Sequence, residues 1–152
     1  MKTILKFERE LDYKKLTVLI AEGNNSVRES LQNGLKPFNC NIIGVRTASE
    51  AILRLTKQRV HVLLTELILP QGSGLDLLRF VQEHRKEWEG FPYVIVVTGM
   101  DSPEYESHAE ELGADEFIPK PVTIREIVKQ LTDFERTLVH TDHGLQMPRI
   151  RV

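Results

Sequence analysis

Four polar residues follow short runs that are typical of β-strands. Glu22 follows TVLIA, Glu66 follows VHVLLT, Thr98 follows YVIVV, and Lys120 comes shortly after DEFI. In an open parallel sheet, ligands and chemistry collect where the strands end. Two carboxylates, a hydroxyl and an ammonium group at one edge would suit phosphate or a divalent cation. The alternative is that each of the four is an ordinary solvated loop residue.

The strand runs alternate with segments of helical pattern. Strands are predicted over 17–21, 41–45, 60–65, 93–97 and 115–118, because short apolar runs are typical of strands buried on both faces. Helices are predicted over 26–36, from the capping box TASE at 47–50 onward, from 75 to about 88, over 102–112, and over 123–138, which begins with a second capping box. Five such alternations require right-handed crossovers, and therefore a parallel sheet with helices on both faces.

The composition restricts the class of protein. The 152 residues are 41% hydrophobic and 28% charged, as in an ordinary globular domain, and the net charge of −2 gives no general attraction to nucleic acid or anionic membranes. No apolar run could span a membrane, and the first residues are too charged for a signal peptide. The single cysteine, Cys40, fits a reducing compartment, so we expect a cytoplasmic protein.

The chain divides into three parts. Residues 17–138 form the α/β domain. Residues 1–16 form an N-terminal extension whose apolar spacing fits both helix and strand, so the extension either packs on the domain or forms a dimerisation helix. Residues 139–152 lack periodicity and are expected to be an extended or mobile C-terminal tail. Neither nucleotide-binding glycine patterns nor recognisable nucleophile–base arrangements occur, so we expect no catalytic residues and no enzyme.

The order of these features resembles the receiver domain of bacterial two-component response regulators, over about residues 17–131. The residues that carry the resemblance are Glu22 after the first strand, ELILP at 66–70 with Gly74, VTG at 97–99, GAD at 113–115, and Lys120-Pro121. The resemblance implies a flavodoxin-like (βα)5 fold, a doubly wound parallel five-stranded sheet with strand order 2-1-3-4-5.

By this resemblance, Glu66 occupies the position of the phospho-acceptor. Thr98 and Lys120 occupy the positions that bind phosphoryl oxygens, and Phe117 occupies the aromatic position that changes rotamer with the signalling state. The Lys120–Pro121 peptide bond would be cis.

The acidic pocket that holds Mg²⁺ in this family would consist here of Glu22, Glu66 and the backbone of Ile68. Gly23 stands where the family has a second strand-one acid, and Glu66 replaces the family's aspartate. With one carboxylate missing and the others longer, we expect weak Mg²⁺ binding and no other cofactor.

The extra methylene of Glu66 moves its carboxylate away from the geometry of in-line attack. The same methylene brings the carboxylate within reach of Lys120 and Thr98, so we predict an ion pair and a hydrogen bond that partly mimic the phosphorylated state. The function would then be independent of phosphorylation. Two alternatives stay open: a receiver that still accepts phosphate or binds Mg²⁺, and a flavodoxin-like domain that binds a small anion or nucleotide.

The predicted fourth helix is acidic. Residues 101–116 contain no Lys or Arg, and the candidate interaction face consists of Glu104, Glu106, Glu110 and Glu111. The simpler interpretation is a solvated helix face. The functional one is a docking surface for a protein partner, either a sensor kinase or a downstream effector, and not for nucleic acid or membrane. In the family, the fourth helix, fifth strand and last helix also form the usual homodimer face.

Overall fold

Five parallel strands form the centre of the molecule. The computed structural model describes residues 14–148. The strands are β1 (Leu16–Ala21), β2 (Cys40–Val45), β3 (Val62–Thr65), β4 (Tyr93–Thr98) and β5 (Glu116–Pro119). They lie in the order β2-β1-β3-β4-β5, and every neighbouring pair is parallel. The predicted flavodoxin-like fold is therefore confirmed.

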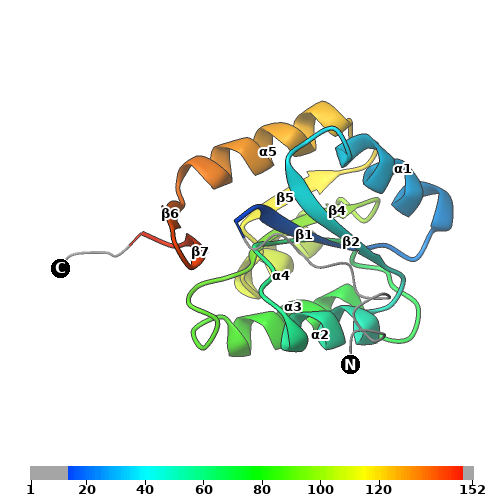
Figure 1. Ribbon diagram of the computed structural model, residues 1–152. Coiled ribbons are helices and arrows are strands. Elements are labelled where there is room, and N and C mark those ends of the chain that lie inside the picture. The colour runs from blue at the N-terminus through cyan, green and yellow to red at the C-terminus, as the bar shows by residue number, and fades with distance from the viewer. Residues whose placement is uncertain (1–13, 149–152) are drawn as a thin grey trace, which may run out of the picture.

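Five helices cover the two faces of this sheet. They are α1 (Asn25–Leu35), α2 (Ala48–Lys57), α3 (Gly74–His84), α4 (Pro103–Glu111) and α5 (Ile124–Arg136). In Figure 1, α1 and α5 lie on one side of the strands, and α2 and α3 lie on the other. The buried apolar residues accordingly form two clusters, one on each side of the sheet. Each strand contributes alternate residues to both clusters, which is why the strand sequences are mostly apolar rather than alternating apolar and polar.

Every helix begins with a side-chain cap. Asn24, Thr47, Ser73, Ser102 and Thr123 each accept a hydrogen bond from the backbone N–H three residues further on. Such caps satisfy donors that the first helical turn leaves free. The capping box predicted at Thr123 is complete.

Several helix boundaries differ from the sequence prediction; the last helix, for example, ends at Arg136 rather than near residue 138. The first helix begins at Asn25 with Asn24 as its cap, rather than at Ser26. The third helix ends at His84 rather than near Trp88. After His84 the chain turns, and the Trp88 ring stacks on the His84 ring with centroids 5.2 Å apart. An apolar residue at helical spacing therefore packs against the helix without continuing it.

The predicted extended or mobile tail is wrong for residues 139–148. They form an antiparallel hairpin of β6 (Val139–Thr141) and β7 (Gly144–Gln146). Leu145 is buried in the cluster that also contains residues of α1 and α5. Strands of three residues are too short to show periodicity in a sequence, so the burial of one leucine was not visible there.

The N-terminal extension largely lies outside the described residues, because the description begins at residue 14. Leu16, assigned to this extension, is instead the first residue of β1. Among residues 14–148, no helix combines the length and the hydropathy needed to cross a membrane. The division of the chain into extension, domain and tail stays a prediction.

Candidate functional site

The four polar residues singled out in the sequence meet at the C-terminal edge of the sheet. Glu22, Glu66 and Lys120 follow the ends of β1, β3 and β5, and Thr98 is the last residue of β4. Their side chains form a connected set, because Glu66 contacts both Thr98 and Lys120 and Lys120 also contacts Glu22. Their predicted convergence is thus present in the structure.

The Lys120 ammonium group lies between two carboxylates. Its Nζ atom is 2.5 Å from Glu22 Oε1 and 2.7 Å from Glu66 Oε2. Glu22 and Glu66 are only 5% and 8% exposed, so both carboxylates need a charged partner to be stable in this position. The predicted Glu66–Lys120 ion pair is present, and the contact between Lys120 and Glu22 is an addition to it.

The second oxygen of Glu66 accepts three hydrogen bonds. The donors are the Thr98 hydroxyl, the backbone N–H of Leu67 at 2.7 Å and the backbone N–H of Ile68 at 3.3 Å. Thr98 Oγ1 in turn accepts from the backbone N–H of Met100 at 3.0 Å, so its own proton is available for Glu66. The predicted Thr98 hydrogen bond is therefore present, and both oxygens of Glu66 are engaged.

These contacts also determine protonation. Burial would raise the pKa of the Glu66 carboxyl, but the hydrogen bonds from Lys120 and Thr98 outweigh burial and lower this pKa below its ordinary value. Burial would lower the pKa of Lys120, but hydrogen bonds to Glu22 and Glu66 raise it above the ordinary value. At neutral pH, Glu66 is therefore ionised and Lys120 is protonated.

The local structure of the chain holds Glu22 in place. Its Oε2 atom accepts from the backbone N–H of Asn24 at 3.0 Å, and its carbonyl oxygen accepts from the Arg28 guanidinium at 2.8 Å. Both partners lie at the entrance to α1. The turn that caps this helix thus also orients the carboxylate that contacts Lys120.

Gly23 lies where the resemblance would place a further acid, and the structure leaves no room there for a side chain. A Cβ atom on Gly23 would lie 2.6 Å from Pro70 Cδ and 3.0 Å from Pro70 Cγ. Pro70 of the β3–α3 loop occupies the space that a side chain at position 23 would need. In this structure, a side chain at position 23 would therefore require Pro70 to shift.

The residues present do not fit Mg²⁺. The cation would need oxygen donors in near-octahedral arrangement, whereas the Lys120 ammonium already bridges Glu22 and Glu66, and Gly23 offers no side-chain oxygen. Within residues 14–148, there is no group of three or more His, Cys, Asp or Glu side chains that could hold a metal ion. The backbone of Ile68 would be the one further donor that the resemblance implies.

The surface above this site is an open hollow of about 440 Å³. Glu22 and Glu66 line it together with the apolar side chains of Ile68, Leu69 and Pro70. The cavity that borders Lys120 has a volume of only about 10 Å³, roughly enough for one water molecule. The carboxylates that line the hollow, together with the pairing of the Lys120 ammonium with both of them, disfavour the alternative of an anion or nucleotide at this edge.

Phe117 and the acidic helix lie close to this edge of the fold. Phe117, on β5, is half-buried and packs against the cluster that contains Ala109 of α4. Its role as a switch stays a prediction. The candidate face on α4 is exposed as predicted at all four positions, Glu104, Glu106, Glu110 and Glu111.

Two other acids of the 101–116 stretch have structural partners instead. Asp115 accepts from the backbone N–H of Val94 at 2.8 Å and pairs with Arg85 at 3.3 Å. Glu116 accepts a hydrogen bond from the Tyr93 hydroxyl at 2.9 Å. The acidic surface of this region therefore contains fewer unpaired carboxylates than the number of acids in the sequence suggests.

The sequence interpretation missed several contributions to the site. The backbone N–H groups of Leu67, Ile68 and Met100 have no side-chain signal, and neither does the packing of Pro70 on Gly23. Asn24 could have been found, because asparagine is a preferred cap directly before a helix.

Comparison with known proteins points to one family. Residues 18–132 match the response regulator receiver domain. The chain is 32% identical over 141 residues to the probable transcriptional regulatory protein TcrX of Mycobacterium tuberculosis, covering 91% of this chain and 58% of TcrX. It is 30% identical over 124 residues to a cyclic di-GMP phosphodiesterase of Thermotoga maritima, covering 82% of this chain and 32% of that protein. The chain thus spans less than two thirds of the length of these relatives.

Solved structures agree with this result. A response regulator receiver protein from Pseudomonas putida superposes with a TM-score of 0.70 at 29% sequence identity, covering 78% of this chain and 97% of that one. Together with the family match over most of the chain, this likeness leads to one conclusion: the chain belongs to the response regulator receiver domain family of two-component signalling.

Proposed function

We propose that this receiver domain signals without being phosphorylated and acts through contact with another protein. The observation that carries the proposal is the position of Lys120 Nζ, 2.5 Å from Glu22 and 2.7 Å from Glu66, in the place where the family uses a cation and a phosphoryl group. The domain would itself perform no catalysis.

The contacts of Glu66 argue against phosphoryl transfer. A carboxylate attacks phosphorus through an oxygen lone pair, and activated nucleophiles need a free, correctly placed atom. One oxygen of Glu66 accepts from Thr98, Leu67 and Ile68, and the other pairs with Lys120. A phosphoryl donor would have to break these contacts first, and the pairing of Lys120 with both carboxylates disfavours a compensating Mg²⁺ ion.

The same contacts support a mimic of the phosphorylated state. In the resembled family, the threonine and lysine bind phosphoryl oxygens. Here both Thr98 and Lys120 contact the oxygens of Glu66 instead. The Glu66 carboxylate would thus hold Thr98 and Lys120 permanently in the positions that these residues take in the family when phosphate is bound.

The interaction surface in this proposal is the acidic outer side of α4. Four exposed glutamates line this helix, with no Lys or Arg among residues 101–116. A two-fold dimer through α4 would bring like charges together, which is unfavourable. We therefore propose a basic surface on a different protein, a kinase or an effector, as the partner.

Phosphorylation is tested with acetyl phosphate, and with beryllofluoride plus Mg²⁺, on the full chain. Two-dimensional amide NMR should show no saturable shifts around Glu66, and mass spectrometry should show no added phosphoryl group. Saturable shifts there, or a phosphorylated species that disappears in Glu66→Gln, would refute the proposal.

The partner surface is tested by charge reversal in a pull-down. Glu106→Lys with Glu110→Lys should reduce recovery of partner proteins. The control is Glu83→Lys with Glu87→Lys. This pair is also exposed and has the same spacing, but it lies at the end of α3 and just after it rather than on α4. Equal recovery with both double variants would discard the role of α4.

A further inference from the structure

The acidic helix α4 is held weakly along its own length. Ala109 is the one buried residue among Pro103–Glu111, and Tyr105 and Leu112 are half-buried against the cluster that also contains residues of α2 and α3. The backbone N–H of Tyr105 lies 3.4 Å from the Ser102 cap, a longer contact than the caps of the other four helices make. A helix with so few buried apolar contacts belongs to the part of a fold that opens locally at low cost.

The charges of α4 add to this weakness. Glu110 and Glu111 lie at the C-terminal end of the helix, where the partial negative charge of the helix dipole repels them. Glu106 and Glu110 are four residues apart, and like charges at that spacing destabilise a helix. The ion pairs found within residues 14–148 all involve other acids. Contacts from outside the helix are therefore needed to hold α4 in place.

Gln82 of α3, and Arg85, which caps the end of α3, supply such contacts. Gln82 Nε2 donates to the carbonyl oxygen of Glu111 at 3.0 Å, and the Arg85 guanidinium donates to that of Gly113 at 3.1 Å. The carbonyl groups of the last helical turn have no partner within the helix, so the bond from Gln82 satisfies an acceptor that α4 itself leaves free. The positive charge of Arg85 lies at the helix end where the dipole favours a cation.

Arg85 also connects the turn after α4 to the sheet. Its guanidinium pairs with Asp115 at 3.3 Å, and the same carboxylate accepts from the backbone N–H of Val94, on β4, at 2.8 Å. Arg85 Nε is buried and has no hydrogen-bond partner in the described part of the chain, so the guanidinium is packed against protein rather than extended into solvent. Removal of this one side chain would therefore break every contact that it makes with the α4–β5 turn.

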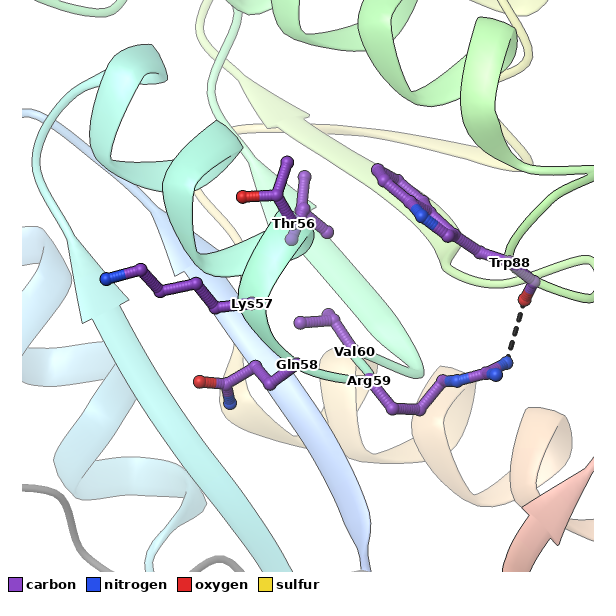
Figure 2. A pocket seen from close by; sticks show the side chains of 7 residues that line it. Thr56, Lys57, Gln58, Arg59, Val60 and Trp88 are labelled. Carbon is purple, nitrogen blue, oxygen red and sulfur yellow. Dashed lines mark hydrogen bonds between the residues drawn. The ribbon is translucent and has the colours of Figure 1, made fainter. Parts of the chain in front are cut away.

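The end of α3 that carries these side chains is itself fixed. Phe80, His84 and Trp88 form a row of neighbouring rings, with centroids 4.2 Å apart for the first pair and 5.2 Å apart for the second. Arg59, just before β3, donates to the carbonyl oxygen of Trp88 at 2.8 Å and pairs with Glu89 at 3.2 Å. Figure 2 shows the Arg59 side chain reaching across to the Trp88 backbone. The end of α3 is thus a firm support, and α4 is the element that it holds.

We propose that Gln82 and Arg85 form a latch that controls α4. While both side chains bind the C-terminal end of the helix, α4 stays closed on the sheet, and when they release it α4 opens locally. The inference rests on the proposed role of α4 as the partner surface and adds its regulation, because a partner that binds only the closed helix binds more weakly as the closed fraction falls. Control of this surface then lies in α3, in contacts separate from Glu66.

Hydrogen–deuterium exchange of the full chain, followed by amide NMR, tests the latch without any partner. Under conditions where the exchange rate is proportional to the open population, the amides of residues 106–114 should exchange about tenfold faster in Arg85→Met, because bonds from a charged donor are lost. Gln82→Met removes one neutral donor, so the same amides should exchange about 2- to 5-fold faster. The reference is the amides of α1, on the opposite face of the sheet, which should change less.

Arg79→Met is the matched control. Arg79 also lies on α3, but it pairs with Asp76 of the same helix at 2.8 Å, so its loss should leave the exchange of α4 unchanged. Unchanged exchange of residues 106–114 in either latch variant, an equal increase in α1, or the same increase in Arg79→Met would overturn the proposal. The charge-reversal pull-down can fail to implicate α4 while these exchange rates still follow the latch, so the two proposals can be refuted separately.

Discussion

Lys120→Met tests the central contact of the candidate site. Methionine keeps the length of the side chain but removes the charge, so Glu22 and Glu66, at 5% and 8% exposure, would lose their shared cation. Breaking a buried ion pair by removing one partner costs about 3–5 kcal/mol. Because the Lys120 side chain is 27% exposed, we expect the lower end, about 3 kcal/mol of unfolding free energy.

The effect of Lys120→Met should depend on pH in a defined direction. In the wild type, the pKa of Glu66 is lowered, so this carboxylate stabilises the fold above its unfolded pKa, near 4.5, and the stabilisation is lost as the pH falls through the folded pKa. In the variant, burial without a cation raises that pKa, so protonation in acid relieves the destabilisation. The difference between the two proteins should therefore be largest near pH 7 and decrease toward pH 4.

The measurement is equilibrium unfolding in urea, followed by circular dichroism at several pH values. Lys129→Met is the control, because Lys129 pairs with Asp133 at 3.2 Å on the surface and should contribute less than about 1 kcal/mol. A loss for Lys120→Met as small as that of the control, or a loss that does not change with pH, would refute the reasoning.

Three further predictions concern packing and titration. Gly23→Ala should destabilise the fold by about 1–3 kcal/mol, because its Cβ would lie 2.6 Å from Pro70, and by clearly less in a Pro70→Ala background; additive losses in urea unfolding would contradict this. Gly74→Ala should cost more than Gly23→Ala, since its Cβ would lie 2.2 Å from the rigid backbone oxygen of Glu66, and similar unfolding midpoints would argue against this. Burial is the main reason that the pKa of His61 is lowered to about 4, so the free energy of unfolding should decrease by up to about 3 kcal/mol as the pH falls from 6.5 to 4. In His61→Asn this decrease should be smaller, and a pH profile equal to that of the wild type would contradict the prediction.

Much of the fold was predictable because local signals agreed with one another. Runs of four to six mostly apolar residues defined the strands, and caps such as Thr47 and Thr123 marked helix starts at the correct residues. The errors came where the sequence spacing of a residue is compatible with more than one local structure. Trp88 has helical spacing but packs back on α3 from a turn, and Leu145 occupies a strand too short to be periodic.

The sequence by itself determined the parallel α/β fold and the four polar residues at its C-terminal edge, because strand ends and their following residues are encoded locally. It also determined that Glu66 carries one methylene more than an aspartate, and thus that contact with Thr98 and Lys120 was within reach. Only the tertiary structure decided that the Lys120 ammonium is shared with Glu22.

The tertiary structure alone also decided that Pro70 fills the space beside Gly23, and that a hairpin after the last helix encloses a second hollow. These features depend on distances between segments far apart in the chain. Residue types and spacings along one segment do not contain such distances, since they are set by how the strands, helices and loops pack together.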